Sequence, residues 1–467
     1  MSYKTFKLLF STASLLVLVV LAVGCNDTLR QFITPVPQPG GDPGRVGNAI
    51  TLSTNPLGNG SDTHINVSGD TEVAIVPTGP NPVFLGATAN RAFAINSDNT
   101  VTVYLALLPT SASNTVTLPG TTSGAVGGGT SSAGNIYIAN SGTNDVSVIS
   151  GSVVAVTNLV PVGTQPVMVA GNAGNNKIYV VNRGSNNITV VSTIDDTVVK
   201  TIAVGSQPVW AVMSADALDV FVVNQGSGTV SVIDTLLDLV IATIPVGPSP
   251  NFAFYDPNLK RVYVSNTGAN TISVIKANGI DLGVTPQVLP VKLADVTLSG
   301  APTSVAALSD GTKAYAALGG CPAGTNHTTI VSSLGSCNGN RVSVIDSNAL
   351  VESKTIQVAP GAVSLSVASD ASRVYVVSAH DTTVITDNVN AIPQPARTIS
   401  TPSVSIIRTS TDTVLRPPVD PSVTSLVPTF HLPQQDPNCV ATIDSTFNKK
   451  VAIPCVGQTP FTVLTVP

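Results

Sequence analysis

An all-β fold is what the sequence predicts, and three observations predict it. First, the chain repeats itself at a step of 42 residues, because "YVVNRGSNNITVV" from Tyr179 returns as "FVVNQGSGTVSVI" from Phe221. Second, each copy contains short apolar stretches separated by turn residues, as strands do. Third, the polar residues are mostly Ser, Thr, Asn and Gly, and Val is the recurrent apolar residue, which favours strands and turns. Repeats of about 40–45 residues with several short strands are typical of propeller blades.

Two positions of the repeat recur without any shift, an aromatic residue and an asparagine three residues later. The pairs are Tyr137 and Asn140, Tyr179 and Asn182, Phe221 and Asn224, and Tyr263 and Asn266. A short amide side chain at the end of a strand can hydrogen-bond the backbone of the following turn. We therefore predict that the asparagines cap turns rather than bind a ligand.

Within one repeat we expect four strands, A to D, ordered from the axis of a ring outward. After Pro208, strand A is "VWAVMS", strand B is "DVFVVN", strand C is "TVSVID" and strand D is "VIATIPV". Strand B is apolar at successive positions, so both of its faces must be covered. Sheets stacked face to face around a ring cover both faces and leave only short edges.

Less regular copies extend the array in both directions. Phe93 precedes Tyr137 by 44 residues, and Tyr315 and Tyr375 follow at steps of 52 and 60 residues. The aromatic anchors therefore number seven, and we predict a β-propeller of seven four-stranded blades, with eight blades as the alternative.

The longer steps place insertions at about 319–340 and 379–402, between strands B and C of two neighbouring copies. Strand-like fragments without a complete set of partners occur at both ends, in 65–82 and 439–460. We therefore predict that residues 48–467 form one propeller whose ring is closed by N-terminal and C-terminal strands in one blade.

The first 24 residues have a short basic segment and then an apolar stretch, as in an export signal. "LAVGC", which ends at Cys25, resembles a bacterial lipobox, in which the cysteine becomes the lipidated N-terminus. We favour this interpretation over a plain signal peptide or an uncleaved anchor. Residues 25–47, rich in Pro and Gly, would be the tether. We expect a lipid-anchored protein of the bacterial cell envelope, on its periplasmic or extracellular face.

The four remaining cysteines form two pairs with a spacing of 16 residues. They are Cys321, Cys337, Cys439 and Cys455. Because exported proteins keep disulfides, we favour Cys321–Cys337 and Cys439–Cys455 among three connectivities, with four free buried thiols as the alternative. The sequence has no C-x-x-C spacing, which disfavours a zinc ribbon, a redox motif and covalent haem.

Charge and motifs exclude several functions. The net charge is −5 and no basic run occurs, which argues against a nucleic-acid partner. There is no G-x-S-x-G, and the Gly-rich segment 123–135 lacks the lysine of a phosphate-binding loop. We predict no catalytic residue and no cofactor.

Candidate binding residues lie in the loops between strands B and C, which share one face of a propeller. Arg183, Gln225 and Thr267 hold the same loop position in successive blades, and the two insertions add His327, His380 and Asp381. Imidazole and carboxylate suit a transition metal. The spacing of these two histidines and the aspartate matches no metal-binding motif. We therefore favour insertions that are only loops closed by a disulfide, and we leave a metal site as the open alternative. We expect His64, in the N-terminal flank, at the surface.

"IYVVNRGSNNITVV", "VFVVNQGSGTVSVID" and "VYVSNTGANTISVI" resemble the bacterial and archaeal YVTN-type propeller repeat over about residues 90–380. The family's Thr is replaced by Ala139, Val181, Val223 and Ser265. The resemblance implies a propeller, in a group that includes surface-layer and envelope proteins, lactonase-type propellers and the haem d1-binding propeller of nitrite reductase. Its motif consists of packing and turn residues, so it transfers no catalytic residue.

We therefore favour a non-enzymatic, membrane-tethered module that binds or scaffolds another envelope protein or a surface ligand through its looped face. One alternative is a propeller enzyme with an axial active site, either a lactonase-like hydrolase or a cofactor-binding oxidoreductase. Another is a protein for surface display or adhesion.

Overall fold

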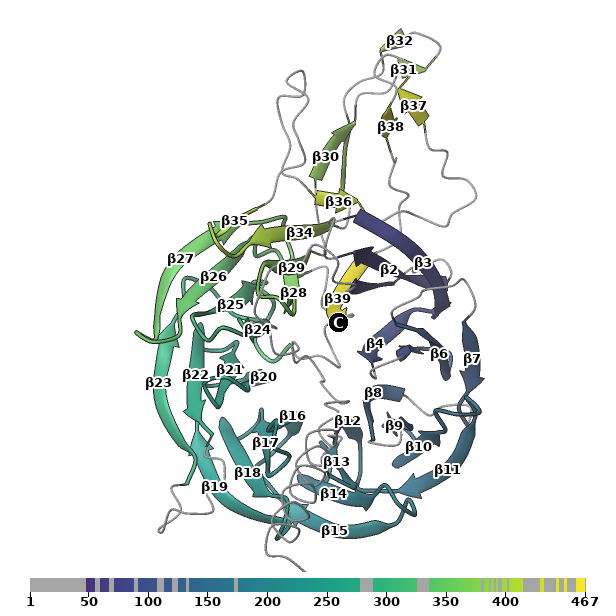
Figure 1. The fold of residues 1–467 in the computed structure, drawn as a ribbon, viewed down its shortest axis with the longest axis vertical. Helices are drawn as coiled ribbons and strands as arrows, with labels where there is room; N and C mark the ends of the chain where they lie inside the picture. Colours follow the sequence, from purple (N-terminus) through teal and green to yellow (C-terminus); the bar gives the residue numbers. More distant parts are fainter. Residues whose placement is uncertain are drawn as a thin grey trace, which may run out of the picture.

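The computed structural model describes residues 48–54, 59–66, 71–87, 91–106, 113–119, 125–131, 134–171, 175–277, 289–325, 336–378, 382–385, 388–389, 392–393, 397–400, 403–414, 429–431, 442–444, 449–451 and 459–466. The described residues form β-strands and no α-helix, and the strands are arranged as a ring of blades (Figure 1). No helix in these ranges has the length and hydropathy to cross a membrane.

Eight sheets of antiparallel strands make up the ring, and each is ordered from the axis outward. Blade 1 consists of β4 (Pro82–Ala87), β5 (Arg91–Asn96), β6 (Thr100–Leu105) and β7 (Asn114–Thr117). Blade 2 consists of β8 (Ala125–Thr130), β9 (Ile136–Asn140), β10 (Asp145–Ile149) and β11 (Val156–Pro161). Blade 3 consists of β12 (Pro166–Gly171), β13 (Lys177–Asn182), β14 (Asn187–Ser192) and β15 (Val198–Ala203). Blade 4 consists of β16 (Pro208–Met213), β17 (Asp219–Asn224), β18 (Thr229–Asp234) and β19 (Leu239–Pro245).

The second half of the ring continues this order with longer connections. Blade 5 consists of β20 (Pro250–Asp256), β21 (Arg261–Asn266), β22 (Thr271–Lys276) and β23 (Val291–Thr297). Blade 6 consists of β24 (Ser304–Ala307), β25 (Lys313–Leu318), β26 (Arg341–Asp346) and β27 (Val351–Gln357). Blade 7 consists of β28 (Ala362–Val367), β29 (Arg373–Ser378), β34 (Ser403–Arg408) and β35 (Thr413–Val414), and β36 (Thr429–His431) also pairs with β34.

Blade 8 closes the ring with strands from both ends of the chain. It consists of β39 (Thr459–Val466), β1 (Asn48–Thr54), β2 (Asn59–Asn66) and β3 (Thr71–Pro80), with β39 innermost. This confirms the predicted closure, but the preferred count of seven blades is wrong and eight is correct. The register explains the error, because Ile50 and Ser53 in β1 take the positions of Tyr179 and Asn182 in β13. This blade therefore has no aromatic anchor to count.

Small hairpins lie outside the ring in Figure 1. They are β30 (Thr382–Ile385) with β33 (Arg397–Ser400), β31 (Asn388–Val389) with β32 (Ile392–Pro393), and β37 (Thr442–Asp444) with β38 (Lys449–Val451). The first two pairs belong to the connection between β29 and β34. That connection therefore extends beyond the rim of the ring.

Burial follows the strand order within a blade. In blade 4 every residue of β17 is buried, whereas β19 is mostly exposed or half-buried. Inner strands are covered on both faces by neighbouring blades, as their unbroken apolar sequence predicts. The core therefore runs around the ring between the blades.

The ring has two different ends. Connections from B to C and from D to A lie at one end, where Arg183 N donates to Gln165 O at 2.9 Å, and we call this end the looped face. Connections from A to B and from C to D lie at the other end, which we call the turn face. The long connections after β25 and β29 both join strands B and C, so both leave from the looped face.

The repeated asparagines differ in detail from the expected turn caps. Asn224 Nδ2 donates across the turn to Thr229 Oγ1 at 3.1 Å and Ser231 Oγ at 2.9 Å, side chains of strand C. The same pair of bonds is made by Asn96, Asn140, Asn182 and Asn266. The amide therefore ties strand B to strand C through side chains rather than through the turn backbone.

Gly205 has a packing role that the sequence did not suggest. A Cβ at this D-to-A position would lie 2.7 Å from Asn224 Cγ, so only glycine lets the loop lie on the amide. The positive φ of this loop belongs instead to Gln207, at 48°. Gly205, in the loop that leads into blade 4, thus packs on the asparagine of blade 4.

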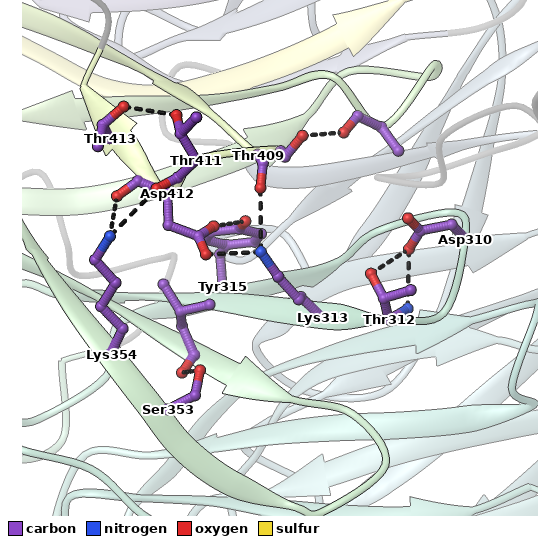
Figure 2. Close-up of polar contacts among 12 residues, drawn as sticks. Asp310, Thr312, Lys313, Tyr315, Ser353, Lys354, Thr409, Thr411, Asp412 and Thr413 are labelled. Atoms are coloured by element: carbon purple, nitrogen blue, oxygen red, sulfur yellow. Dashed lines mark hydrogen bonds and ion pairs between the residues drawn. The ribbon is translucent and has the colours of Figure 1, made fainter.

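Tyrosine hydroxyls of strand B link blades 2, 3, 5 and 6 to the next blade on the turn face. Tyr179 Oη donates to Asp238 Oδ1 at 2.8 Å, and Lys177 Nζ pairs with the other oxygen of that carboxylate at 2.7 Å. Figure 2 shows the same arrangement three blades further on, where Tyr315 and Lys313 both contact Asp412. The tyrosine of the repeat is therefore a link between blades as well as a core residue.

Candidate functional site

Three predicted binding residues occupy equivalent places on the looped face. Their backbone N–H groups donate to the D-to-A loop of the same blade: Arg183 to Gln165 O, Gln225 to Gln207 O and Thr267 to Ser249 O. The register therefore brings them to one face in three successive blades. Their side chains differ in what they contact.

Thr267 is buried and its Oγ1 donates to Ser249 O at 2.9 Å, so its side chain serves the loop. Gln225 is half-buried, and its Nε2 donates to Gly324 O at 3.2 Å. Arg183 is also half-buried. Of the three residues, Gln225 and Arg183 are the ones whose side chains the looped face presents.

The connection between β25 and β26 crosses the looped face. It begins on blade 6, and Gly324 O within it accepts the hydrogen bond from Gln225 of blade 4. Cys321 and Cys337 close its base in a disulfide with a Cα–Cα distance of 4.1 Å, as predicted. Both cysteines are buried. We call residues 319–325 and 336–340 the stapled loop.

Several predicted positions lie outside the described residues. They are Cys25, His327, His380, Asp381, Cys439 and Cys455. Within the described ranges, no group of three or more His, Cys, Asp or Glu side chains has the geometry to hold a metal ion. The alternative of a metal site in the insertions, which the sequence left open, stays untested.

A buried polar cluster lies where the closing blade meets blade 1. His64, expected at the surface, is fully buried in β2, two residues after the fully buried Asp62. Tyr104 of β6 packs edge-on against His64, with ring centroids 5.5 Å apart. The Asp62 carboxyl oxygens, both His64 nitrogens and the Tyr104 hydroxyl are buried and have no hydrogen-bond partner among the described residues.

The registers show how unusual this cluster is. Asp62 and His64 pair with Leu52 and Ile50 of β1, as Ile188 and Val190 of β14 pair with Val181 and Tyr179 of β13. Two positions that are apolar in blade 3 therefore carry an acid and an imidazole in blade 8. Tyr104 pairs with Ala92, and the matching pair in blade 3 is Val191 with Ile178. The sequence signal was an Asp-x-His in a strand, which was missed because β2 was not recognised as a complete strand C.

Burial changes the acid–base chemistry of the cluster. It raises the pKa of Asp62 to about 8, an effect that the nearby Tyr104 hydroxyl partly offsets. It lowers the pKa of His64 to about 4 and raises that of Tyr104. All three groups are therefore neutral near pH 7. The cluster lies inside the wall of the ring, away from the looped face.

Comparisons with known proteins agree on the fold. The chain matches no protein-family model and no curated protein at a significant level. Among solved structures, dihydro-heme d1 dehydrogenase NirN in complex with DHE is similar, with a TM-score of 0.59 and 10% identity over 84% of this chain and 77% of that chain.

Two further solved structures are less similar. Hydrazine synthase of Kuenenia stuttgartiensis has a TM-score of 0.43 and 19% identity over 63% of this chain and 79% of that chain. A functionally unknown protein from Desulfotomaculum acetoxidans DSM 771 has a TM-score of 0.48 and 11% identity over 64% and 92%. The identities are low, and it is the likeness to NirN that supports the propeller fold.

Proposed function

We propose that this chain is a membrane-tethered propeller that binds another envelope component through its looped face. The observation that carries the proposal is the stapled loop, which spans from blade 6 to Gln225 on blade 4. A disulfide at the base of a loop restricts the conformations that the loop can adopt, which a simple connection between two strands does not need. A rigid loop over the mouth of a ring is a suitable recognition surface.

The rest of the looped face supports the same role. The connection after β29 leaves from this face and forms hairpins beyond the rim (Figure 1). Arg183 and Gln225 add one charged and one amide side chain to it. Long connections concentrated on one end of a scaffold are typical of binding proteins.

Family and anchor are part of the proposal. The repeated Tyr-Val-x-Asn segments support membership of the YVTN-type group, whose envelope members suggest a scaffolding role. The apolar stretch before Cys25 supports lipidation there and a place in the bacterial envelope.

The test is crosslinking in intact membranes. One variant carries Arg183→Ala on the looped face, together with His327→Ala and His380→Ala in the two insertions. A control carries Lys260→Ala, Asn348→Ala and Ser410→Ala, exposed residues of the turn face. We expect a crosslinked partner to be lost or reduced in the first variant and kept in the control. An unchanged set of partners in both variants would show that the looped face is not the binding surface.

The enzymatic alternatives are separated by a second measurement on the same purified protein. Metal analysis, an absorption spectrum and a screen for lactone hydrolysis would each give a positive signal for an axial active site. The proposed binding role predicts no turnover. Protease digestion of intact cells tests surface display, because only a chain on the outer surface would be cut.

A further inference from the structure

Large apolar side chains are exposed on the turn face of three successive blades. The residues are Val153, Ile194, Val198, Leu236, Leu237 and Leu239, which we call the apolar rim. Ile194 is 78% exposed, Leu236 68% and Val153 67%. Single exposed apolar residues are ordinary, but a run across neighbouring blades marks an interaction surface.

The apolar turn positions of the rim lie in blades 2, 3 and 4, whereas the exposed Val291 and Val351 of blades 5 and 6 lie at the first position of strand D. In blades 2, 3 and 4 the C-to-D turns carry Val153, Ile194 and the Leu236–Leu237 pair. The equivalent turns of blades 6 and 7 carry Asn348 and Ser410 instead. Because these turns share one backbone conformation, with a positive φ at Asp238, Leu350 and Asp412, turn geometry does not demand apolar residues.

The rim is held rigidly. Asp234 Oδ1 accepts hydrogen bonds from the backbone N–H groups of Leu236 and Leu237, at 2.8 and 2.9 Å. Lys200 Nζ of blade 3 donates to Leu237 O of blade 4 at 3.3 Å, which joins the two blades' parts of the surface. Asp238 is occupied by Lys177 and Tyr179. Lys177 thus neutralises the Asp238 carboxylate beside the leucines, whose aliphatic tips stay exposed.

The chain enters the ring at the same face. Asn48 begins β1 opposite Asn66, the last residue of β2, as Lys177 begins β13 opposite Ser192, the last residue of β14. The C-to-D turn follows directly after that residue. The tether of residues 25–47 thus joins the turn face, opposite the stapled loop.

We infer that the apolar rim rests against the lipid bilayer, so that the turn face lies toward the membrane and the looped face away from it. The inference relies on the lipid anchor of the proposed function. A tether of 23 residues keeps the ring within roughly 80 Å of the membrane. Because the tether holds the ring near the bilayer, the local concentration of the ring there is high. A few aliphatic side chains then suffice to orient the ring. Lipids with neutral headgroups suit the rim, because Asp195 places a negative charge beside it and Lys200 a positive one.

Tryptophan quenching by lipid tests the orientation. The only tryptophan, Trp210, is buried, and its Nε1 donates to Ala253 O of the next blade, so it provides a constant background. Leu237→Trp adds a reporter on the rim, and Ser410→Trp adds a control reporter in the equivalent turn of blade 7. Each full-length protein, purified from the membranes of an expressing bacterium, is reconstituted in phosphatidylcholine vesicles that carry brominated acyl chains.

We expect bromine to quench most of the added emission of Leu237→Trp and little of that of Ser410→Trp. Equal emission of the two reporters in vesicle-bound protein would overturn the inference and leave the anchor intact. Protein that fails to float with the vesicles would overturn the anchor itself, and the inference with it. An unchanged Trp210 signal checks that each variant is folded.

Discussion

At the scale of single residues, the tyrosine of the repeat does more than fill the core. Tyr137, Tyr179 and Tyr315 donate to Asp196, Asp238 and Asp412 of the next blade. Blade 1 has Phe93 at this position, and the matching turn of blade 2 has Val154 instead of an aspartate. In these pairs the hydroxyl and the carboxylate are present or absent together, whereas Tyr263 of blade 5 meets a turn with Leu350 and bonds Ser347 instead.

Removing one such hydroxyl should weaken the ring. Tyr315→Phe deletes a 2.5 Å bond to a half-buried carboxylate, so we expect a loss of about 1.5–3 kcal/mol in unfolding free energy. Tyr263→Phe, whose hydroxyl bonds the neutral Ser347 at 3.2 Å, should cost only about 0.5–1.5 kcal/mol. Urea unfolding measures both, and equal losses would contradict the role of the charge.

The Asp62–His64 cluster predicts a pH dependence with a defined sign. The folded pKa of Asp62 is about 8, above the usual 3.8, so its stabilising contribution is complete below pH 3.8 and is lost as the pH rises to 8. The folded pKa of His64 is about 4, below the usual 6.5, so stability rises with pH between these values. The two slopes cancel up to about pH 6.5, and stability then falls by about 1.4 kcal/mol per pH unit until about pH 8.

The variant Asp62→Val tests this sign. Its stability relative to the natural chain should increase steadily between pH 4 and 8, because the cost of keeping a carboxyl protonated is removed. Thermal unfolding at several pH values measures the difference between the two chains. Parallel curves would show that Asp62 titrates as an ordinary surface carboxyl.

At the scale of the element, blades 3, 4 and 5 each have a close contact between the D-to-A loop and the end of strand B. Gly205 lies on Asn224, Gly163 on Asn182 and Gly247 on Asn266. The repeat period, the four strands and the disulfide could all be predicted from the sequence, since they depend on local pattern and spacing. The contact between Gly205 and Asn224 could not be predicted, because a glycine is required there by the lack of space beside the amide and not by a positive φ.

Gly205→Ala should therefore be destabilising. Its Cβ would approach Asn224 Cγ to 2.7 Å, and relieving that overlap costs roughly 1–3 kcal/mol. Gly300→Ala is the matched control, because its Cβ would have no neighbour closer than 3.6 Å. We expect the control to be neutral in urea unfolding. If Gly205→Ala left the unfolding free energy unchanged, the loop would be able to move away from the Asn224 amide.

At the scale of the whole molecule, the ring has two faces with different chemistry. The stapled loop lies on one face, and the aliphatic turns of blades 2–4 lie on the other. Sequence reasoning found the looped face because insertions interrupt a regular step. It preferred seven blades to the alternative of eight, since β1 has Ile50 and Ser53 in place of the repeated pair, and it misplaced His64 for the same reason. Sequence reasoning also did not use the constant spacing of the tyrosine–aspartate links, since Tyr137–Asp196 and Tyr179–Asp238 are both 59 residues apart.

Both faces depend on the closure of the ring by β39 and β1, and disulfide trapping tests that closure most directly. Thr51 and Val463 are opposite one another in register, so Thr51→Cys with Val463→Cys should form an intramolecular disulfide, detected by mass spectrometry of the digested chain. Thr51→Cys with Leu464→Cys is one residue out of register and should not. A crosslink in neither pair, or only between separate chains, would contradict an eight-bladed ring closed by its two ends.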